Sequence, residues 1–500
     1  MTSKSPWMSI AVAPGAIPLQ GDERCDVAVI GSGIAGLSTA YELSQCGRSV
    51  VVIDRGPIAG GMTARTSAHL APLCDDLMSE MQKIKGEKLS KLFYESQAAA
   101  VDRIEEIQKT EGIDCDFRRL DGYLFQGDDM PSDVIDEELD AVRAVGASVE
   151  RLVGVPLKGC DSRHVLRYPR QATFHPLKYL AGVAEACAKR KVLFFADTPV
   201  EEVVEENGAV TIKTVRGTIR AGHAVVATNS SIEDRVALHS KMSPYRTYVV
   251  VFAIDRGALP DALYWDTEEP YHYVRLQPGD DGKDFVLVGG EDHKSGEADD
   301  ADTRFQRLEQ WARGKMPMLK DVTHRWSGQV LDTIDYAGFI GRNPGSKYIY
   351  VATGDSGQGL THGVMGAMLN ATLVTGGESK WAELYAPDRK PLKAAKNWVM
   401  ENSTALKNLA EYVAPGEISS VDELEPGQGA IIREGLKKIA AYRDAKGDVH
   451  RHSAACTHLG CHLHWNSFEN CWDCPCHGSI FGPEGEVLNA PAVSGLNPVS

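Results

Sequence analysis

The chain has 500 residues, of which 43% are hydrophobic, so it is long enough for two or three domains with cores of their own. Its formal net charge of −16 at pH 7 disfavours binding to nucleic acid or anionic lipid and leaves small molecules or cationic proteins as expected partners. No apolar run has the length of a membrane span, and residues 1–20, an N-terminal extension, lack the pattern of a secretion signal. We therefore expect no membrane span and a cytoplasmic location.

The first predicted element is a strand, turn, helix and strand unit that is typical of dinucleotide binding. A buried strand over residues 25–30 leads into a glycine-rich turn, and a helix to about residue 46 precedes a second strand that ends at an acid. The glycines permit a tight turn and a close approach to a pyrophosphate, which the helix N-terminus attracts. The acid is placed to accept a hydrogen bond from a ribose hydroxyl. These residues are Gly31, Gly33, Gly36 and Asp54.

A second glycine-rich junction lies far along the chain. Residues 347–352 predict a buried strand that runs into Gly354, Gly357 and Gly359, and a helical segment follows. The two junctions together resemble the FAD site of the D-amino-acid-oxidase-like family, which includes glycine oxidase and amine oxidoreductases; NAD binding alone would not explain both. The resemblance implies an α/β flavoprotein, with a Rossmann-like FAD domain and an antiparallel-sheet substrate domain. It also places the second helix N-terminus near the flavin ring, where reduction adds negative charge.

This resemblance covers about residues 21–385 as one FAD-dependent oxidoreductase domain. It implies FAD-binding parts at about residues 21–75, 175–235 and 335–380. It also implies a substrate sheet at about residues 240–330. It implies further cofactor contacts from Arg55, Arg65, Thr66, Ala68, Val200, Leu360 and Thr361. Relatives sometimes attach flavin covalently in the region of His69, but we expect non-covalent FAD here.

Substrate chemistry is assigned to the predicted antiparallel sheet. Arg275 could hold a substrate carboxylate with two parallel hydrogen bonds, which favours an amino acid, although a strand arginine is as often an ion-pair partner. His272 and His293 could act as general bases, and the competing interpretation of each is a structural histidine.

The composition changes near residue 386, and residues 386–416 predict a helical connector. Its apolar positions recur at helical spacing and predict that it packs on the flavoprotein domain. These positions are Trp398, Val399, Leu406, Leu409 and Val413. Residues 417–500 then predict a small all-β domain.

Two loops in this last domain carry a metal-binding pattern. Each supplies one cysteine and one histidine, from Cys456 and His458 in the first loop and from Cys474 and His477 in the second. Two thiolates and two imidazoles suit a [2Fe–2S] centre in which each pair holds one iron. Zinc also accepts this donor set, but zinc-finger spacing places a cysteine pair before a histidine pair.

The two loops resemble those of Rieske proteins of the respiratory and photosynthetic kind. The resemblance implies that these four residues bind the cluster and that a disulfide joins Cys461 to Cys476, which would be unusual in the cytoplasm. Phe481 stands where the family has a tyrosine that donates a hydrogen bond to the cluster. Loss of this donor predicts a reduction potential in the lower part of the Rieske range.

Flavin and cluster on one chain indicate how electrons move, because flavin accepts two electrons and the cluster carries one at a time. We expect an FAD-dependent dehydrogenase that oxidises the C–N bond of an amine or amino acid. Its electrons would leave through the Rieske cluster to a one-electron carrier such as a ferredoxin, a cytochrome or a quinone-linked protein. The alternatives are a reductase or electron-transfer module in which the cluster feeds FAD, and an oxygen-consuming oxidase.

Overall fold

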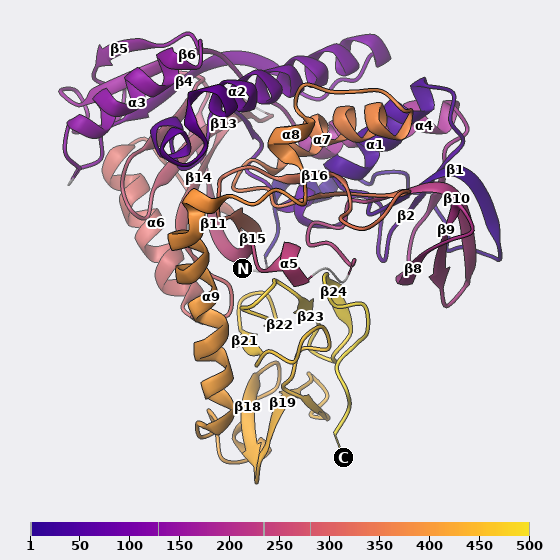
Figure 1. The fold of residues 1–500 in the computed structure, drawn as a ribbon. Helices are drawn as coiled ribbons and strands as arrows, with labels where there is room; N and C mark the ends of the chain where they lie inside the picture. The colour runs from indigo at the N-terminus through magenta and orange to yellow at the C-terminus, as the bar shows by residue number, and fades with distance from the viewer. Residues whose placement is uncertain (1–2, 129, 234–235, 281, 500) are drawn as a thin grey trace.

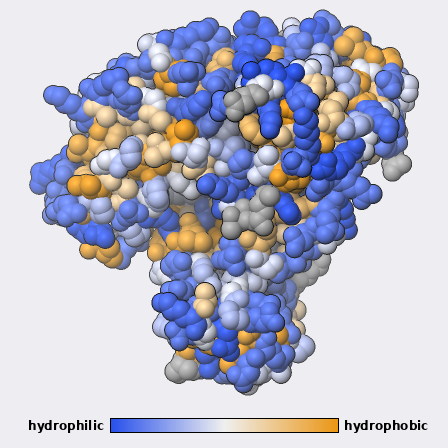
Figure 2. Space-filling view, turned by 180° about the vertical axis from the view of Figure 1, so that it is seen from behind, coloured by the Kyte–Doolittle hydropathy of each residue, from blue (hydrophilic) through white to orange (hydrophobic). Residues whose placement is uncertain are grey.

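The computed structural model describes residues 3–128, 130–233, 236–280 and 282–499, apart from the side chains at 236, 237, 392, 403–407 and 409. Figure 1 shows a large body that contains two sheets and a smaller lobe formed by the C-terminal residues, with a long helix running from one to the other. In Figure 2 the smaller lobe narrows below the body, and the face in view is mostly hydrophilic.

The first sheet contains the dinucleotide-binding unit. Its main path has the order β16-β17-β10-β1-β2-β7, and β1 pairs in parallel with β10 on one side and β2 on the other. Its central strands are buried hydrophobic runs, as expected for parallel strands covered on both faces. The bounds are β1 Glu23–Ile30, β2 Val50–Ile53, β7 Leu193–Phe195, β8 Val200–Glu206, β9 Ala209–Thr214, β10 Gly217–Val226, β16 Phe339–Arg342 and β17 Ile349–Thr353.

Two of the helices that pack on this sheet begin at the glycine-rich junctions. Helix α1 (Ile34–Gln45) follows β1, and α7 (Gly359–Val374) follows β17. A Cβ atom on Gly36 would lie 1.9 Å from the carbonyl oxygen of Gly31, so only glycine permits this approach of helix to turn. Gly363 similarly permits contact between α7 and Ile34 of α1. The two helix N-termini are thereby held close together at the same edge of the sheet.

The second sheet has the order β15-β11-β14-β13-β12-β4-β6-β3 and contains the antiparallel strands predicted for the substrate domain. Helix α6 (Ala301–Lys315) packs on β11 and β14. The strands are β3 His69–Leu70, β4 Arg118–Phe125, β5 Glu150–Val153, β6 His164–Thr173, β11 Met242–Asp255, β12 Leu263–Asp266, β13 His272–Pro278, β14 Lys283–Lys294 and β15 Val322–Thr333. The remaining longer helices of the body are α2 Met78–Glu111, α3 Asp133–Ala144 and α4 Pro176–Lys189. The predicted flavoprotein architecture is confirmed.

The C-terminal lobe is all-β, as predicted, and the structure shows that it consists of two small antiparallel sheets. One sheet has three strands and forms the outer end of the lobe, whereas the other has four and lies against the body (Figure 1). The strands are β18 Gly429–Glu434, β19 Lys437–Arg443, β20 Val449–Ser453, β21 His464–Asn466, β22 Cys471–Asp473, β23 Ile480–Phe481 and β24 Val487–Asn489.

The connector contains helix α9 (Ala395–Ala410), but its expected apolar packing is wrong where it can be checked. Trp398, Val399 and Val413 are all exposed, and the side chains of Leu406 and Leu409 lie outside the described residues. Polar contacts hold the helix to the body instead. Glu401 pairs with Lys294 at 2.7 Å, Asn402 donates to the Ser240 carbonyl and Asn397 donates to the Ile334 carbonyl. Helical spacing alone did not reveal which positions lie against the protein.

Candidate active site and cluster centre

A cavity of about 500 Å³ lies where the two sheets meet. One end is formed by the turn after β1 and by Asp54 at the end of β2, and the N-terminus of α7 contributes another part of the wall. Asp54 accepts a hydrogen bond from the Ser32 amide at 2.7 Å, which fixes the carboxylate beside the glycine-rich turn. All the predicted cofactor residues except Gly36 and Ala68 line this cavity.

The cavity wall fits FAD. The turn leaves backbone amides and no Cβ atoms at Gly31 and Gly33, and the helix behind it supplies the positive end of its dipole for a pyrophosphate. The second helix N-terminus, at Gly359, lines the same cavity. Gly36 contributes through helix packing rather than contact, and Ala68 is fully buried behind the wall.

The part of the cavity beside the second sheet is rich in carboxylates and aromatic rings. Its carboxylates are Asp75, Asp76, Glu269, Asp292, Asp332 and Asp355, and its aromatic residues are Tyr245, Trp265, Tyr271 and Tyr273. Burial and repulsion from neighbouring acids raise the pKa of Asp76 and that of Asp292 to about 7. Burial also raises the pKa of Asp75 and that of Asp355 to about 6. Sequence reasoning missed this acidic wall, because its members come from separate loops and strands.

The three predicted catalytic residues do not line the cavity. The Arg275 guanidinium is fully buried and donates hydrogen bonds to the carbonyls of Ser67, Ala68 and Phe174 and to the side chain of Gln277. Its donors are therefore committed to the protein, and its predicted grip on a substrate carboxylate is wrong.

The two predicted bases are structural histidines. His272 bonds Asp266 at 3.0 Å through Nδ1 and stacks on Trp311, with ring centroids 4.2 Å apart. His293 bonds the Tyr248 hydroxyl at 3.0 Å and contacts the carbonyl of Lys294. A general base must be within hydrogen-bond reach of its proton, and neither ring lines the cavity.

Two histidines line the cavity, His362 of α7 and His69. Burial and the nearby Arg275 guanidinium lower the pKa of His69 to about 3, so the ring is uncharged at neutral pH. It meets Tyr273 edge to face, with ring centroids 5.3 Å apart.

The four predicted cluster ligands come together in the C-terminal lobe. Cys456 and Cys474 are buried and their thiols are within hydrogen-bonding distance, and the rings of His458 and His477 lie 5.2 Å apart. The buried Nδ1 of His477 has no hydrogen-bond partner among the described residues. Two thiolates beside two imidazoles fit a [2Fe–2S] centre of the Rieske type.

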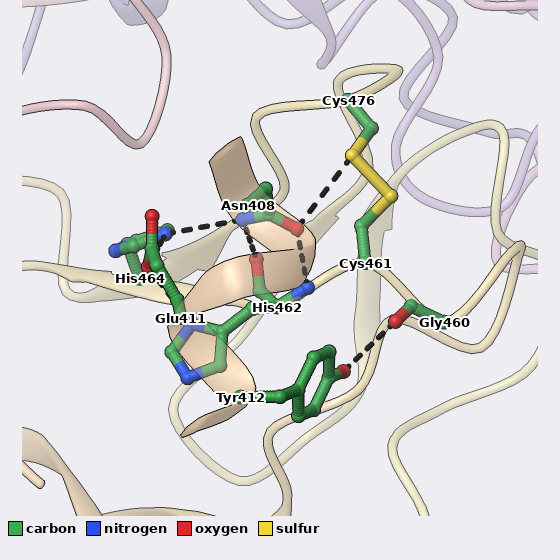
Figure 3. Close-up of a disulfide and its surroundings, with 8 residues drawn as sticks. All are labelled: Asn408, Glu411, Tyr412, Gly460, Cys461, His462, His464 and Cys476. Carbon is green, nitrogen blue, oxygen red and sulfur yellow. Dashed lines mark hydrogen bonds and ion pairs between the residues drawn. A yellow bond between two sulfur atoms is a disulfide. The ribbon is translucent and has the colours of Figure 1, made fainter. Parts of the chain in front are cut away.

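A disulfide joins Cys461 to Cys476, as the resemblance implied. Figure 3 shows Asn408 of the connector lying against this bond. The Asn408 amide exchanges two hydrogen bonds with the backbone of His462, at 2.7 and 3.0 Å, and Tyr412 donates to the carbonyl of Gly460 at 2.8 Å. The connector thus supports the first ligand loop through polar contacts.

The ligand loops face the flavoprotein body. His239, at the end of the short helix α5 (Val236–His239), packs against His458 and His477, with ring centroids 4.9 and 5.7 Å away. The Ser230 hydroxyl donates to the carbonyl of His477 at 3.3 Å. Asn489, the last residue of β24, forms part of the cavity wall. Its side-chain amide also donates a hydrogen bond to Gln329 of β15 at 3.0 Å.

Ion pairs fix the lobe in this position. One nitrogen of Arg246 of β11, Nη2, donates to both carboxylate oxygens of Asp473 of β22, at 2.7 and 2.8 Å, and both side chains are at most 3% exposed. Arg65, in the cavity wall, pairs with Glu469 at 2.9 Å. Phe481, which replaces the expected tyrosine, is fully buried beside the second ligand loop.

The family model of FAD dependent oxidoreductases matches residues 26–373. The chain belongs to this family. The model of the Rieske [2Fe-2S] domain matches residues 415–500, so this oxidoreductase carries both FAD and a [2Fe–2S] cluster. Among the described residues, no helix is long and apolar enough to span a bilayer.

Relatives repeat this architecture in whole or in part. A Bacillus subtilis (strain 168) chain, YhfW, described as a Rieske 2Fe-2S iron-sulfur protein, is 29% identical over 99% of this chain and 97% of its own. Gamma-glutamylputrescine oxidoreductase of Escherichia coli (strain K12) is 25% identical over 70% of this chain and 84% of its own. Glycine oxidase from Geobacillus kaustophilus has a similar fold, with a TM-score of 0.63 and 18% identity over 74% of this chain and 99% of its own.

Proposed function

We propose that this FAD-dependent oxidoreductase is a dehydrogenase that oxidises an amine or amino acid at its C–N bond. The substrate would lose two electrons and two protons to become an imine, which water hydrolyses to a carbonyl compound and a free amine or ammonia. When bound, FAD accepts a hydride and the Rieske cluster carries electrons one at a time to an external one-electron acceptor.

The observation that carries this proposal is the position of the cluster loops against the flavin cavity. Asn489 of the C-terminal lobe lines the cavity, and both histidine ligands face the body at His239. The buried Arg246–Asp473 pair holds this arrangement. A lobe fixed in this way supports electron transfer within one chain, which an oxidase that passes electrons directly to oxygen does not need.

The cavity wall can also manage the substrate's protons. An ammonium group must release a proton before its carbon can give up a hydride. The carboxylates of Asp76 and Asp292, each with a pKa raised to about 7, are suited to accept that proton near neutral pH. The aromatic residues beside them limit the access of water to the reacting carbon.

The test is anaerobic mixing of the holoenzyme with a panel of amines and amino acids. We expect one compound to bleach the flavin absorbance and to produce the EPR signal of the reduced cluster in the same preparation. A Cys456→Ser variant, which lacks a cluster ligand, serves as the matched control and should show bleaching alone. If no compound bleaches the flavin but an external one-electron donor reduces cluster and flavin, the reductase direction replaces this proposal.

A further inference from the structure

The substrate end of the cavity brings together carboxyl groups from distant parts of the chain. The six carboxylates come from the loop after β3, the segment before β13, strands β14 and β15, and the loop after β17. Their side chains converge on one space although no single acidic stretch of sequence supplies them. Only folding of the chain brings these side chains together at the cavity.

No ion pair with a cation of the described residues balances these carboxylates. Among the residues that the structure describes, none of the six carboxylates forms a salt bridge, and the described wall includes two arginines and no lysine. Arg65 is paired with Glu469, and Arg55 donates to the carbonyls of Val487 and Ala492. The two wall histidines, His69 and His362, are uncharged at neutral pH, because burial lowers their pKa values to about 3 and about 4. Both wall arginines are thus directed at the C-terminal lobe.

The hydrogen bonds that the acids do make leave capacity for a ligand. Tyr271 donates to Asp75 at 3.0 Å, and the Leu331 amide donates to Asp355 at 2.7 Å. The buried Oδ1 of Asp292 has no partner within the described part of the chain. A buried carboxylate oxygen without a donor is costly, so this atom indicates a donor that arrives with the ligand.

Aromatic rings stand beside the acids. Tyr271 and Tyr273 are neighbours, with ring centroids 5.7 Å apart, and Tyr245 and Trp265 line the same space. Aromatic faces attract ammonium groups, and carboxylates supply the hydrogen-bond acceptors that such groups require. The wall therefore combines the two kinds of group that bind organic cations.

We propose that the substrate is an amine with two or more positive charges and no carboxylate, of the diamine or polyamine class. The inference rests on the proposed oxidation of a C–N bond at this cavity and names its substrate class. One ammonium is held by the carboxylates while another nitrogen lies at the flavin end. A free carboxylate on the substrate would meet repulsion from the wall, and Arg275, which could have bound it, is buried behind β3 and β6.

The experiment measures binding separately from turnover. Spermidine is titrated into the anaerobic holoenzyme, and the perturbation of the flavin absorption spectrum reports occupation of the cavity rather than of the acidic outer surface. Glycine and glutamate are the comparison ligands. We expect spermidine to bind at least about tenfold more tightly than either amino acid, and its affinity to fall with added salt.

Variants locate the interaction. Asp292→Asn and Asp76→Asn each remove a charge without changing shape and should weaken spermidine binding by about tenfold. Asp140→Asn, at an exposed position of α3 outside the cavity, should leave it unchanged. FAD content and circular dichroism verify that each variant is folded. Because two cavity variants are measured, the test still applies if one of them does not fold.

The outcomes separate this inference from the function on which it rests. Spermidine binding with the expected variant pattern, but without anaerobic bleaching, would contradict the C–N oxidation and support the cation site. Flavin bleaching by an amino acid that binds more tightly than spermidine would support the oxidation and overturn the cation site. Equal spermidine affinity in wild type and both cavity variants would also overturn it.

Discussion

Charged side chains surround the flavin cavity in two contrasting groups. At the contact with the C-terminal lobe, Arg246 and Asp473 are buried and paired, and Ser327 and Asn466 satisfy further hydrogen-bonding atoms of the pair. At the substrate end, the six carboxylates face one another, and none of them forms a salt bridge among the described residues. The two charges of the first group are paired within the chain, although Nε of Arg246 has no partner among the described residues, whereas the carboxylates of the second group have no ion-pair partner there.

This contrast indicates what each group does. A buried ion pair that is also hydrogen-bonded fixes two parts of a protein relative to each other. Removing one partner lowers the free energy of unfolding, because the other charge stays buried without a partner. Charges that share a cavity without counter-ions raise each other's pKa and favour any cation that enters. We therefore assign the paired group to docking of the Rieske domain and the unpaired group to the substrate.

The largest expected effect comes from breaking the paired group. Arg246→Met leaves Asp473 buried without a counter-charge and should lower the free energy of unfolding by about 3–5 kcal/mol. Urea titration of the holoenzyme measures this loss. The double variant Arg246→Met/Asp473→Leu should recover most of it, and a single variant as stable as wild type would show that the pair does not fix the lobe.

The unpaired group predicts a pH dependence of cation binding. Raised pKa values leave Asp76 and Asp292 largely protonated at pH 6 and ionised at pH 8, while amines of the lysine type stay protonated. A cation favours the ionised form, so spermidine should bind about tenfold more tightly at pH 8 than at pH 6. Besides each other, the charged and titratable groups that face these two acids are Asp75, Glu80, Glu269, Asp332 and Arg304.

Spectroscopic titrations across this pH range check the prediction. The Asp76→Asn/Asp292→Asn double variant should show a much flatter dependence. An affinity that is constant from pH 6 to pH 8 in the wild type would contradict the contrast between paired and unpaired groups.

The smallest effect concerns the cluster. Phe481→Tyr should restore a hydrogen-bond donor near the cluster and stabilise its reduced form. One hydrogen bond of about 1 kcal/mol corresponds to a rise in potential of roughly 50 mV for one electron. A redox titration followed by EPR measures it, with Phe468→Tyr, outside the ligand loops, as control. An unchanged or lower potential would refute the role given to the missing donor.

The two cofactor sites could be predicted from the sequence, whereas the acidic wall of the cavity could not. The cluster site lies within one short stretch, and the FAD turn places Gly31 and Asp54 by local geometry, so both could be inferred from motifs. The acidic wall could not, because β14, β15 and three loops meet only in the folded chain. Arg275 was misjudged for the same reason, since the carbonyls that accept its hydrogen bonds belong to Ala68, just before β3, and Phe174, just after β6. Side-chain direction on a strand depends on partners that are distant in sequence.

Electron transfer within one chain is the central claim, and photoreduction of the flavin tests it most directly because no substrate is needed. A light pulse reduces FAD in the anaerobic holoenzyme, and the absorbance of flavin and cluster is followed with time. We predict that the cluster becomes reduced as the flavin is reoxidised, with a first-order rate that does not change with protein concentration. A rate that rises in proportion to protein concentration, or a cluster that stays oxidised, would contradict the account.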